Sequence, residues 1–426
     1  MWCGRSIESN LRILVVSQYF WPENFRINDL VKEWVRRGHE VTVLTGLPNY
    51  PEGQVFDAYR AQPEAFSAYE GATVFRTPML PRGTGSLRLM MNYLSFVLGA
   101  CVVGPWLLRG KPIDAIFVFE PSPVTVGLPA ILLGRIKQTP VIFWALDLWP
   151  ETLAAIGAVR STRVLGWVGY LVRFIYNRCT LVLGQSRGFL GSMAQYCDDT
   201  TKIRYFPSWA EDVFISGDYP PAPELPRVTD GFTVLFAGNI GEAQDMPAVL
   251  DAAECLKDNS HIRWVIVGDG RKSEWLHAEV MRRGLKQRVF LPGRFPLERM
   301  PAFYAHADAL LVSLKRDPVF SMTIPGKVQS YLMAGIPLLG MLDGEGAAVI
   351  RDAKAGLTCD AGDGAALARA VLDMAAMKPE ERERLGSNGL EYARKEFGRT
   401  QLMDRLETLL AEAICTSKTC LLKTRK

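Results

Sequence analysis

A lysine at the start of a predicted helix is the side chain in this sequence best placed for chemistry. Pro325 and Gly326 precede Lys327, and Ala334-Gly335 closes the segment, which predicts a helix between them. A helix N-terminus presents unpaired N–H groups and the positive end of the helix dipole. Lys327 adds a full charge there, so the segment suits a phosphate or diphosphate. A solvated surface lysine is the alternative.

Two acidic side chains follow apolar runs that are typical of buried strands. Glu120 follows residues 115–119, and Asp147 follows residues 141–145. Ligands of parallel sheets bind at the carboxyl ends of the strands. Asp147 is suited to orient or deprotonate a hydroxyl, and Trp149 to stack on a sugar face. A helix cap at Asp147 and a core position for Trp149 are the alternatives.

Polar residues and glycines in other loops are further candidates. In the first loop, Glu23 and Arg26 are predicted to face phosphates, and Asn24 lies between them. Gly268-Asp269-Gly270 follows a predicted strand, where glycines permit either a plain turn or close ligand approach. Glu345 lies between two glycines, and either binds sugar hydroxyls or is favoured by a helix dipole.

Strands and helices alternate along the chain, which predicts an α/β fold of two doubly wound Rossmann-like domains facing a central cleft. The proline-rich segment 207–231 interrupts the alternation and is predicted to be the linker. The N-terminal domain is then 1–206, the C-terminal domain 232–395, and a C-terminal helix with a basic tail 396–426. The predicted strands are 12–19, 41–45, 73–76, 115–119, 141–145, 181–183, 233–237, 263–267, 289–291, 309–312 and 337–340.

Composition excludes several classes of function. The formal net charge is +4 with both signs interspersed, which argues against nucleic-acid binding. The four histidines do not have metal-ligand spacing, so a zinc site is not expected. No metal and no cofactor is predicted. The eight cysteines contain no CxxC pair and fit reduced core thiols of a cytosolic protein. No secretory signal is recognised at the N-terminus.

One apolar stretch is long enough to cross a bilayer. Residues 89–108 are flanked by Arg88 and Arg109, but polar residues and glycines interrupt them, and they lie inside a strand–helix series. We therefore expect a helix on the domain surface, which either touches lipid or is core. Residues 167–178 mix aromatics with arginines, as interfacial helices do, and have the same two interpretations.

Several motifs together resemble glycosyltransferase family 4, whose members have the GT-B fold. The motifs are Arg37-Gly-His-Glu-Val-Thr-Val-Leu-Thr45, Gly238-Asn239, Val267-Gly-Asp-Gly270, and Pro325-Gly-Lys327 with Ala334-Gly-Ile-Pro337. Leu44-Thr-Gly-Leu-Pro-Asn-Tyr-Pro51 and Asp147-Leu-Trp-Pro-Glu151 are similar to the WbuB-like branch, associated with L-fucosamine transfer in O-antigen and with colanic-acid assembly.

The resemblance implies a donor site in the C-terminal domain. The sequence departs from the family pattern there, because the loop Ile240-Gly-Glu-Ala-Gln244 lacks the usual Arg and Lys. The usual Glu-x7-Glu pair is absent, because Gln329-Ser330 stands where the second Glu is expected and Ser321-Met322 eight residues earlier. Neutral groups or another carboxylate, such as Glu345, would then hold the ribose. The predicted donor-binding residues are Gly238, Asn239, Gly268, Asp269, Gly270, Arg294, Phe295, Lys315, Pro325, Gly326, Gln329, Ser330, Glu345 and Gly346.

The same resemblance implies a retaining, metal-independent glycosyltransferase of bacterial surface polysaccharide biosynthesis. It would move a sugar from a UDP- or GDP-linked donor to a lipid-linked glycan, acting in the cytoplasm at the inner membrane face. Lys327, Asp147 and Glu120 would serve catalysis, and Glu23, Asn24, Arg26 and Trp149 would bind the acceptor. The alternatives are a sugar-nucleotide 2-epimerase of the same fold and a catalytically silent sugar-nucleotide-binding subunit.

Overall fold

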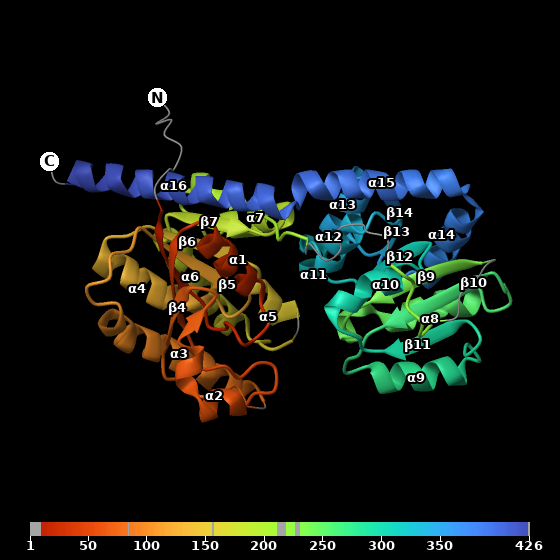
Figure 1. The fold of residues 1–426 in the computed structure, drawn as a ribbon, viewed down its shortest axis with the longest axis horizontal. Helices are drawn as coiled ribbons and strands as arrows, with labels where there is room; N and C mark the ends of the chain where they lie inside the picture. Colours follow the sequence, from red (N-terminus) through yellow and green to blue (C-terminus); the bar gives the residue numbers. More distant parts are fainter. Residues whose placement is uncertain (1–9, 84, 156, 211–218, 226–230, 425–426) are drawn as a thin grey trace. The chain divides into compact units, whose positions relative to one another are not determined.

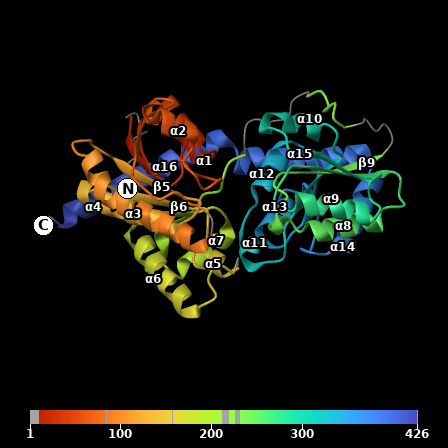
Figure 2. The ribbon, with the colours of Figure 1, turned by 90° about the horizontal axis from the view of Figure 1, so that it is seen from below.

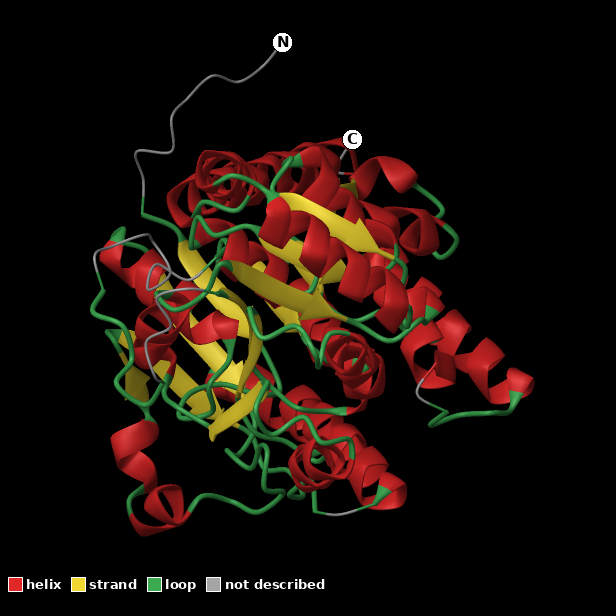
Figure 3. Ribbon diagram, turned by 90° about the vertical axis from the view of Figure 1, so that its right-hand side faces the viewer, coloured by secondary structure: helices red, strands yellow, loops and turns green. Residues whose placement is uncertain are grey.

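The computed structural model describes residues 10–83, 85–155, 157–210, 219–225 and 231–424. Contacts between Cα atoms divide the chain into two compact units. The first comprises residues 1–185, 189–206 and 405–426, and the second comprises residues 186–188 and 207–404. Each unit is built on one sheet with helices packed around it (Figures 1 and 3).

The first unit has an eight-stranded sheet in the order β3-β4-β2-β1-β5-β6-β7-β8. All neighbours pair in parallel except β3 and β4. The strands are β1 (Arg12–Val16), β2 (Glu40–Thr45), β3 (Ala68–Tyr69), β4 (Ala72–Arg76), β5 (Ala115–Glu120), β6 (Val141–Ala145), β7 (Leu181–Gly184) and β8 (Ile203–Tyr205). The connecting helices are α1 (Arg26–Arg36), α2 (Asp57–Ala61), α3 (Ser86–Leu107), α4 (Gly127–Lys137), α5 (Glu151–Ala155), α6 (Thr162–Arg178) and α7 (Arg187–Ala194).

The second unit has a six-stranded parallel sheet in the order β11-β10-β9-β12-β13-β14. Its strands are β9 (Phe232–Ala237), β10 (Ile262–Val267), β11 (Val289–Gly293), β12 (Ala309–Ser313), β13 (Leu338–Met341) and β14 (Gly356–Cys359). Its helices are α8 (Met246–Cys255), α9 (Ser273–Arg282), α10 (Met300–Tyr304), α11 (Pro318–Met322), α12 (Gly326–Met333), α13 (Gly344–Asp352), α14 (Gly364–Ala376) and α15 (Pro379–Glu396).

Strand order reverses once in each sheet, which determines where ligands can bind. In the first unit the chain passes from β1 to β2 on one side, and β5 pairs with β1 on the other. In the second unit β10 and β12 flank β9 in the same way. The central strands are buried apolar runs, since helices cover both faces of the sheet. The loops after these strands diverge at the reversal and leave a crevice.

The predicted α/β architecture is confirmed, and every predicted strand is present within a few residues of its expected ends. The strands β3, β8 and β14 were not predicted. They are short or only partly buried and occupy or adjoin sheet edges, so they lack a long apolar run. Of the predicted linker, residues 211–218 and 226–230 lie outside the described residues.

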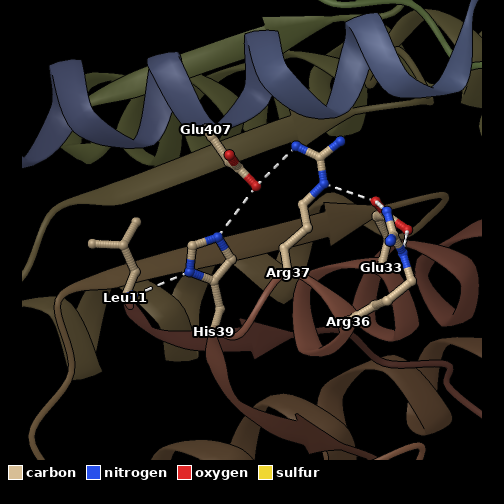
Figure 4. A network of polar contacts seen from close by, with 6 residues as sticks. All are labelled: Leu11, Glu33, Arg36, Arg37, His39 and Glu407. Atoms are coloured by element: carbon tan, nitrogen blue, oxygen red, sulfur yellow. Dashed lines mark hydrogen bonds and ion pairs between the residues drawn. The ribbon is translucent and has the colours of Figure 1, made fainter. Parts of the chain in front are cut away.

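Helix α16 (Arg399–Thr424) accounts for most of the predicted C-terminal helix and basic tail, 396–426. Its residues from Arg405 onward belong to the first unit. Figure 4 shows one reason for this attachment. Glu407 of α16 accepts hydrogen bonds from Arg37 Nη1 and His39 Nε2, each at 3.2 Å. His39 Nδ1 accepts the Leu11 N–H at 3.1 Å, so its proton is on Nε2.

Candidate active site

A cavity of about 530 Å³ lies in the second unit, where β9, β10 and β11 end and α12 begins. This is the crevice created by the reversal of strand order. Nine predicted donor-side residues line it together with six others that the sequence did not indicate. The predicted ones are Gly238, Asn239, Gly268, Asp269, Gly270, Arg294, Phe295, Lys327 and Ser330, and the others are Ala237, Val267, Leu297, Met300, Tyr304 and Tyr331.

Lys327 is a half-buried cation in this cavity. Its Nζ lies 4.7 Å from the centroid of the Phe236 ring. Among the described residues, no carboxylate makes a salt bridge with it, and burial lowers its pKa to about 8. Lys327 is the second residue of α12, where helix geometry leaves the N–H groups without intrahelical acceptors. A charge that is costly to bury and lacks an anion favours an anionic ligand at this point.

Glycine is required at these positions of the cavity for two different structural reasons. A Cβ on Gly238 would lie 2.6 Å from Lys327 Cε, so this glycine makes room for the lysine side chain. A Cβ on Gly268 would lie 1.9 Å from the Gly238 carbonyl oxygen, and one on Gly270 would lie 2.4 Å from that of Ile240. These two glycines therefore allow adjacent loops to pack. Both were predicted as either turn or ligand-approach residues, and the loop packing explains them without a ligand.

Part of the cavity lining is apolar. It includes Phe295, Leu297 and Met300, and Phe295 packs on Phe303 with ring centroids 4.6 Å apart. The buried Tyr331 hydroxyl donates to the Ala237 carbonyl at 3.0 Å and accepts the Ala237 N–H at 2.8 Å. The hydroxyl therefore satisfies the backbone N–H and carbonyl of Ala237, at the point where β9 and β12 diverge. The cavity thus combines a cationic end with a flat apolar surface.

Several predicted donor residues lie outside this cavity. Gln329 is 1% exposed, and its Nε2 donates to the Ser208 carbonyl at 2.9 Å, so its side chain is used in packing. Lys315 is exposed and pairs with Glu242 at 3.4 Å. Pro325 is the N-cap of α12, and Gly326 is the exposed first residue of that helix.

Two further predictions concern the acidic loop at the start of α13. Glu345 is half-buried in the first turn of that helix and does not line the cavity. Gly346 is buried, and a Cβ there would lie 2.5 Å from Leu342 Cδ1 and 3.0 Å from Pro325 Cδ. The glycine therefore allows α13 to pack against the segment that caps α12, which is a structural role.

A second cavity, of about 310 Å³, lies in the first unit where β1, β5 and β6 end. Asp147 and Trp149 are the two predicted site residues that line it. The other lining residues are Tyr19, Phe25, Tyr50, Arg82, Leu89, Tyr93, Pro121, Ser122, Thr152, Leu153 and Ala158. Aromatic rings predominate: Tyr19 stacks on Phe25 with centroids 5.3 Å apart. Such a surface suits the apolar face of a sugar ring.

Asp147 is the acidic group of the second cavity. It accepts hydrogen bonds from Thr152 Oγ1 at 2.5 Å and Trp149 Nε1 at 3.1 Å. Burial raises its pKa, and these hydrogen bonds oppose the rise. The Asp147 carboxylate is therefore held in one orientation, and Trp149, 9% exposed, contributes to the wall as well as to the core.

Glu120, the last residue of β5, is fully buried behind this cavity. Neither of its carboxylate oxygens has a hydrogen-bond partner within normal distance in the described structure. Burial raises its pKa well above the usual range, and the nearby negative charge of Asp147 raises it further. Burial therefore favours the protonated form of Glu120, and its side chain does not line the cavity.

The first-loop predictions lie elsewhere. Glu23 is 2% exposed and accepts the N–H groups of Phe20, Asn49 and Tyr50 at 3.1, 2.8 and 2.7 Å. It joins two loops rather than facing a ligand, and burial raises its pKa to about 7. Asn24 is exposed, and Arg26 begins α1; neither lines the cavity.

Arg82 is the cation of the second cavity, and sequence analysis did not select it. Its guanidinium lies 5.3 Å from the centroid of the Tyr50 ring, and the backbone N–H of Arg82 donates to Asn49 Oδ1 at 2.9 Å. Asn49 and Tyr50 belong to the Leu-Pro-Asn-Tyr-Pro motif. That motif was the available signal, since it positions Arg82.

Family models match both halves of the chain. Residues 24–209 match "Glycosyl transferase 4-like domain", and residues 231–377 match "Glycosyl transferases group 1". The chain is a family-4 glycosyltransferase. The second matched segment contains all the lining residues of the cavity in the second unit, and the first contains those of the other cavity except Tyr19. The predicted family is therefore confirmed.

Curated and solved relatives agree with this assignment. The chain is 26% identical over 344 residues to the "Putative colanic acid biosynthesis glycosyl transferase WcaI" of Escherichia coli K12, covering 76% of this glycosyltransferase and 82% of that protein. Similar folds include Anabaena HepE in complex with UDP (13% identity, TM-score 0.68, 94% and 100% coverage) and the lipopolysaccharide glycosyltransferase WaaG (13%, 0.62, 94% and 99%). These structures confirm the predicted GT-B fold.

Proposed function

We propose that this glycosyltransferase transfers a sugar, with retention of anomeric configuration and without a metal, from a nucleotide-diphosphate donor to a lipid-linked glycan of bacterial surface polysaccharide. The observation that carries the proposal is Lys327, a half-buried cation without an anionic partner among the described residues, at the start of α12. The similarity to a protein named for colanic acid biosynthesis supports the polysaccharide product. The reaction would occur in the cytoplasm, at the inner membrane face.

The donor would occupy the cavity of the second unit. Its diphosphate would lie at Lys327 and the first N–H groups of α12, and its base would lie against Phe295, Leu297 and Met300. Structures of similar fold that bind UDP and UDP-glucose support a nucleotide donor, with UDP and GDP both chemically suitable. Asn239 and Ser330 line the same cavity and would provide neutral hydrogen bonds to ribose or sugar hydroxyls.

The acceptor would occupy the cavity of the first unit. Arg82 would bind an acceptor phosphate, and Trp149 and Tyr50 would pack on sugar rings. The bond between the donor's anomeric carbon and its phosphate oxygen breaks, and the acceptor hydroxyl oxygen bonds to that carbon. Negative charge grows on the leaving diphosphate, where Lys327 stabilises it. The hydroxyl proton passes to Asp147 or to the departing phosphate oxygen.

Labelled nucleotide sugars, incubated with and without an extract of lipid-linked glycan, test the proposal. The expected result is label in the lipid fraction, free nucleoside diphosphate in equal amount and an unchanged anomeric configuration. A changed donor sugar without acceptor would indicate a 2-epimerase. Donor binding without turnover would indicate a binding subunit. A thermal-shift screen of UDP- and GDP-linked sugars would select the donor beforehand.

A further inference from the structure

We propose that α3 and α6 lie flat on an anionic membrane surface and dock the first unit there. The proposal deepens the membrane location proposed above, because it names the face, the mode of contact and the lipid charge. α3 is the one helix in the described part of the chain that is long and apolar enough to cross a bilayer, and 22% of its apolar window is buried.

The sides of α3 are reversed relative to an ordinary surface helix. Its buried residues are Asn92, Ala100 and Gly104, which are polar or small, and a single large apolar residue, Phe96. Asn92 is 0% exposed, accepts from Gln18 Nε2 at 2.8 Å and donates to the Leu80 carbonyl at 2.6 Å. A Cβ on Gly99 would lie 2.2 Å from the Pro78 carbonyl oxygen, so the helix rests directly on backbone.

The outward side of α3 carries its large apolar residues. They recur every three or four positions, between 39% and 74% exposed, and are Leu87, Met90, Met91, Leu94, Leu98, Val102 and Trp106. A helix that meets water normally has the opposite arrangement, and a continuous exposed apolar stripe marks an interaction surface. At 22 residues the stripe is roughly 33 Å long.

α6 extends the same kind of surface. It exposes Val164, Trp167, Tyr170 and Phe174, with Trp167 at 72% and Tyr170 at 74%. Both α3 and α6 pack against α4, and Figure 2 shows α6 below α3 in the first unit. Exposed tryptophan and tyrosine side chains are typical of the boundary between lipid and water.

Charge identifies the occupant as an anionic bilayer. Neither α3 nor α6 contains an aspartate or glutamate. The exposed cations Arg88 and Arg109 lie at the two ends of α3, and Arg163 lies in the first turn of α6. Apolar burial together with cations around its margin is the arrangement of helices that lie in the membrane interface.

α3 cannot cross the membrane in this fold. Its buried side bonds to Gln18 and Leu80, and its ends connect to β4 and β5 of the sheet. Docking in the plane keeps these contacts. Leu89 and Tyr93 of the same helix line the cavity of the first unit, so the docked face would bring that cavity close to the lipid headgroups.

Vesicle cosedimentation of the full chain tests the docking. We expect binding to phosphatidylethanolamine–phosphatidylglycerol vesicles, much weaker binding to phosphatidylcholine vesicles, and release by alkaline carbonate. The triple variant L98Q/V102Q/W106Q should bind at least roughly tenfold more weakly, and W167Q/Y170Q, on the other helix, several-fold more weakly. R88Q/R109Q/R163Q should lose the preference for anionic lipid. M281Q, an equally exposed apolar residue on α9, should bind as the native protein does.

Circular dichroism and donor thermal shift show whether each variant is folded. Unchanged vesicle binding by both folded apolar variants would overturn the proposal, as would retention after carbonate. A native dimer in sedimentation equilibrium that L98Q/V102Q/W106Q converts to monomer would show that a second copy covers this face instead. The vesicle measurement needs neither donor nor acceptor. Transfer to a water-soluble acceptor therefore tests the proposed function separately.

Discussion

Gly238 and Lys327 are a complementary pair: a Cβ at position 238 would lie 2.6 Å from the lysine Cε. Gly238→Ala should therefore displace the Lys327 side chain while leaving its charge in place. We expect the dissociation constant for nucleoside diphosphate to rise by roughly tenfold, about 1.4 kcal/mol. Isothermal titration calorimetry measures it. Gly191→Ala is the control, since nothing lies within 4 Å of its added Cβ. An unchanged dissociation constant for nucleoside diphosphate would show that Gly238 has no part in donor binding.

Removing the Lys327 charge should have opposite effects on activity and stability. Lys327→Met should lower turnover by about 10²-fold or more, because the leaving diphosphate loses its cation. Without ligand the variant should be more stable at pH 7, by about 1–2 kcal/mol, since burial disfavours the charge. Steady-state kinetics and urea unfolding measure the two effects. Lys315→Ala, which removes an exposed lysine paired with Glu242, should change neither by much.

The pH dependence of donor binding follows from the same lysine. In the free protein its pKa is lowered to about 8, so it is protonated below pH 8 and neutral above. Affinity for nucleoside diphosphate should fall as pH rises through 8, and Lys327→Met should remove this dependence. The stability advantage of Lys327→Met should shrink between pH 8 and 10.5, where native Lys327 loses its charge only in the folded state. A flat affinity profile for the native protein would contradict the assignment.

Glu120 and Asp147 should respond differently to amide substitution. Asp147→Asn should reduce turnover strongly with donor affinity unchanged. The pKa of Glu120 is higher in the folded state than in the unfolded state. At a pH above the unfolded-state pKa, the folded state therefore keeps a proton that the unfolded state has lost, and stability falls as the pH rises through this range. Glu120→Gln should remove that decline and be the more stable protein at pH 8. The free energy of unfolding, measured with urea between about pH 5 and 8, checks this prediction. If the stability of Glu120→Gln still fell with rising pH, Glu120 would not be the group that causes the decline.

Substitution of Arg82 should weaken acceptor binding and leave donor binding unchanged. Arg82→Gln removes the cation of the first unit's cavity, so the KM for a phosphate-linked acceptor should rise by roughly tenfold or more. Donor affinity should be unchanged. Arg60→Gln, an exposed arginine paired with Asp57, is the matched control. An equal effect with an acceptor that lacks phosphate would contradict phosphate binding.

Glu407 should contribute more to stability than the neighbouring Glu412. Glu407 pairs with Arg37 and His39, whose side chains are 16% and 8% exposed, whereas Arg204, the partner of Glu412, is 34% exposed. Glu407→Gln should cost about 1–2 kcal/mol, and Glu412→Gln less than about 1 kcal/mol. Urea unfolding compares them, and hydrogen exchange in α16 should increase in the first variant. Equal costs would show that the network in Figure 4 is not what holds this helix.

Local patterns in the sequence determined the helices and strands, and with them the carboxyl ends of the strands, where ligands bind. Apolar runs such as 141–145 produce buried strands wherever they lie, because helices cover both sides of a parallel sheet. Pro325 and Gly335 delimit α12 through backbone conformations that are local properties of these residues. These rules sufficed to predict the described strands other than β3, β8 and β14, and the helix that carries Lys327.

Only the tertiary structure decided which side chains face a ligand. Gln329 and Ser330 are adjacent, yet Ser330 lines the cavity and Gln329 bonds to Ser208, because successive residues of a helix point about 100° apart. Glu23 became a buried link between loops, and Arg82 a cavity cation, through contacts with the distant Asn49–Tyr50 segment. Such contacts depend on how segments far apart in the chain pack, and no local pattern encodes that.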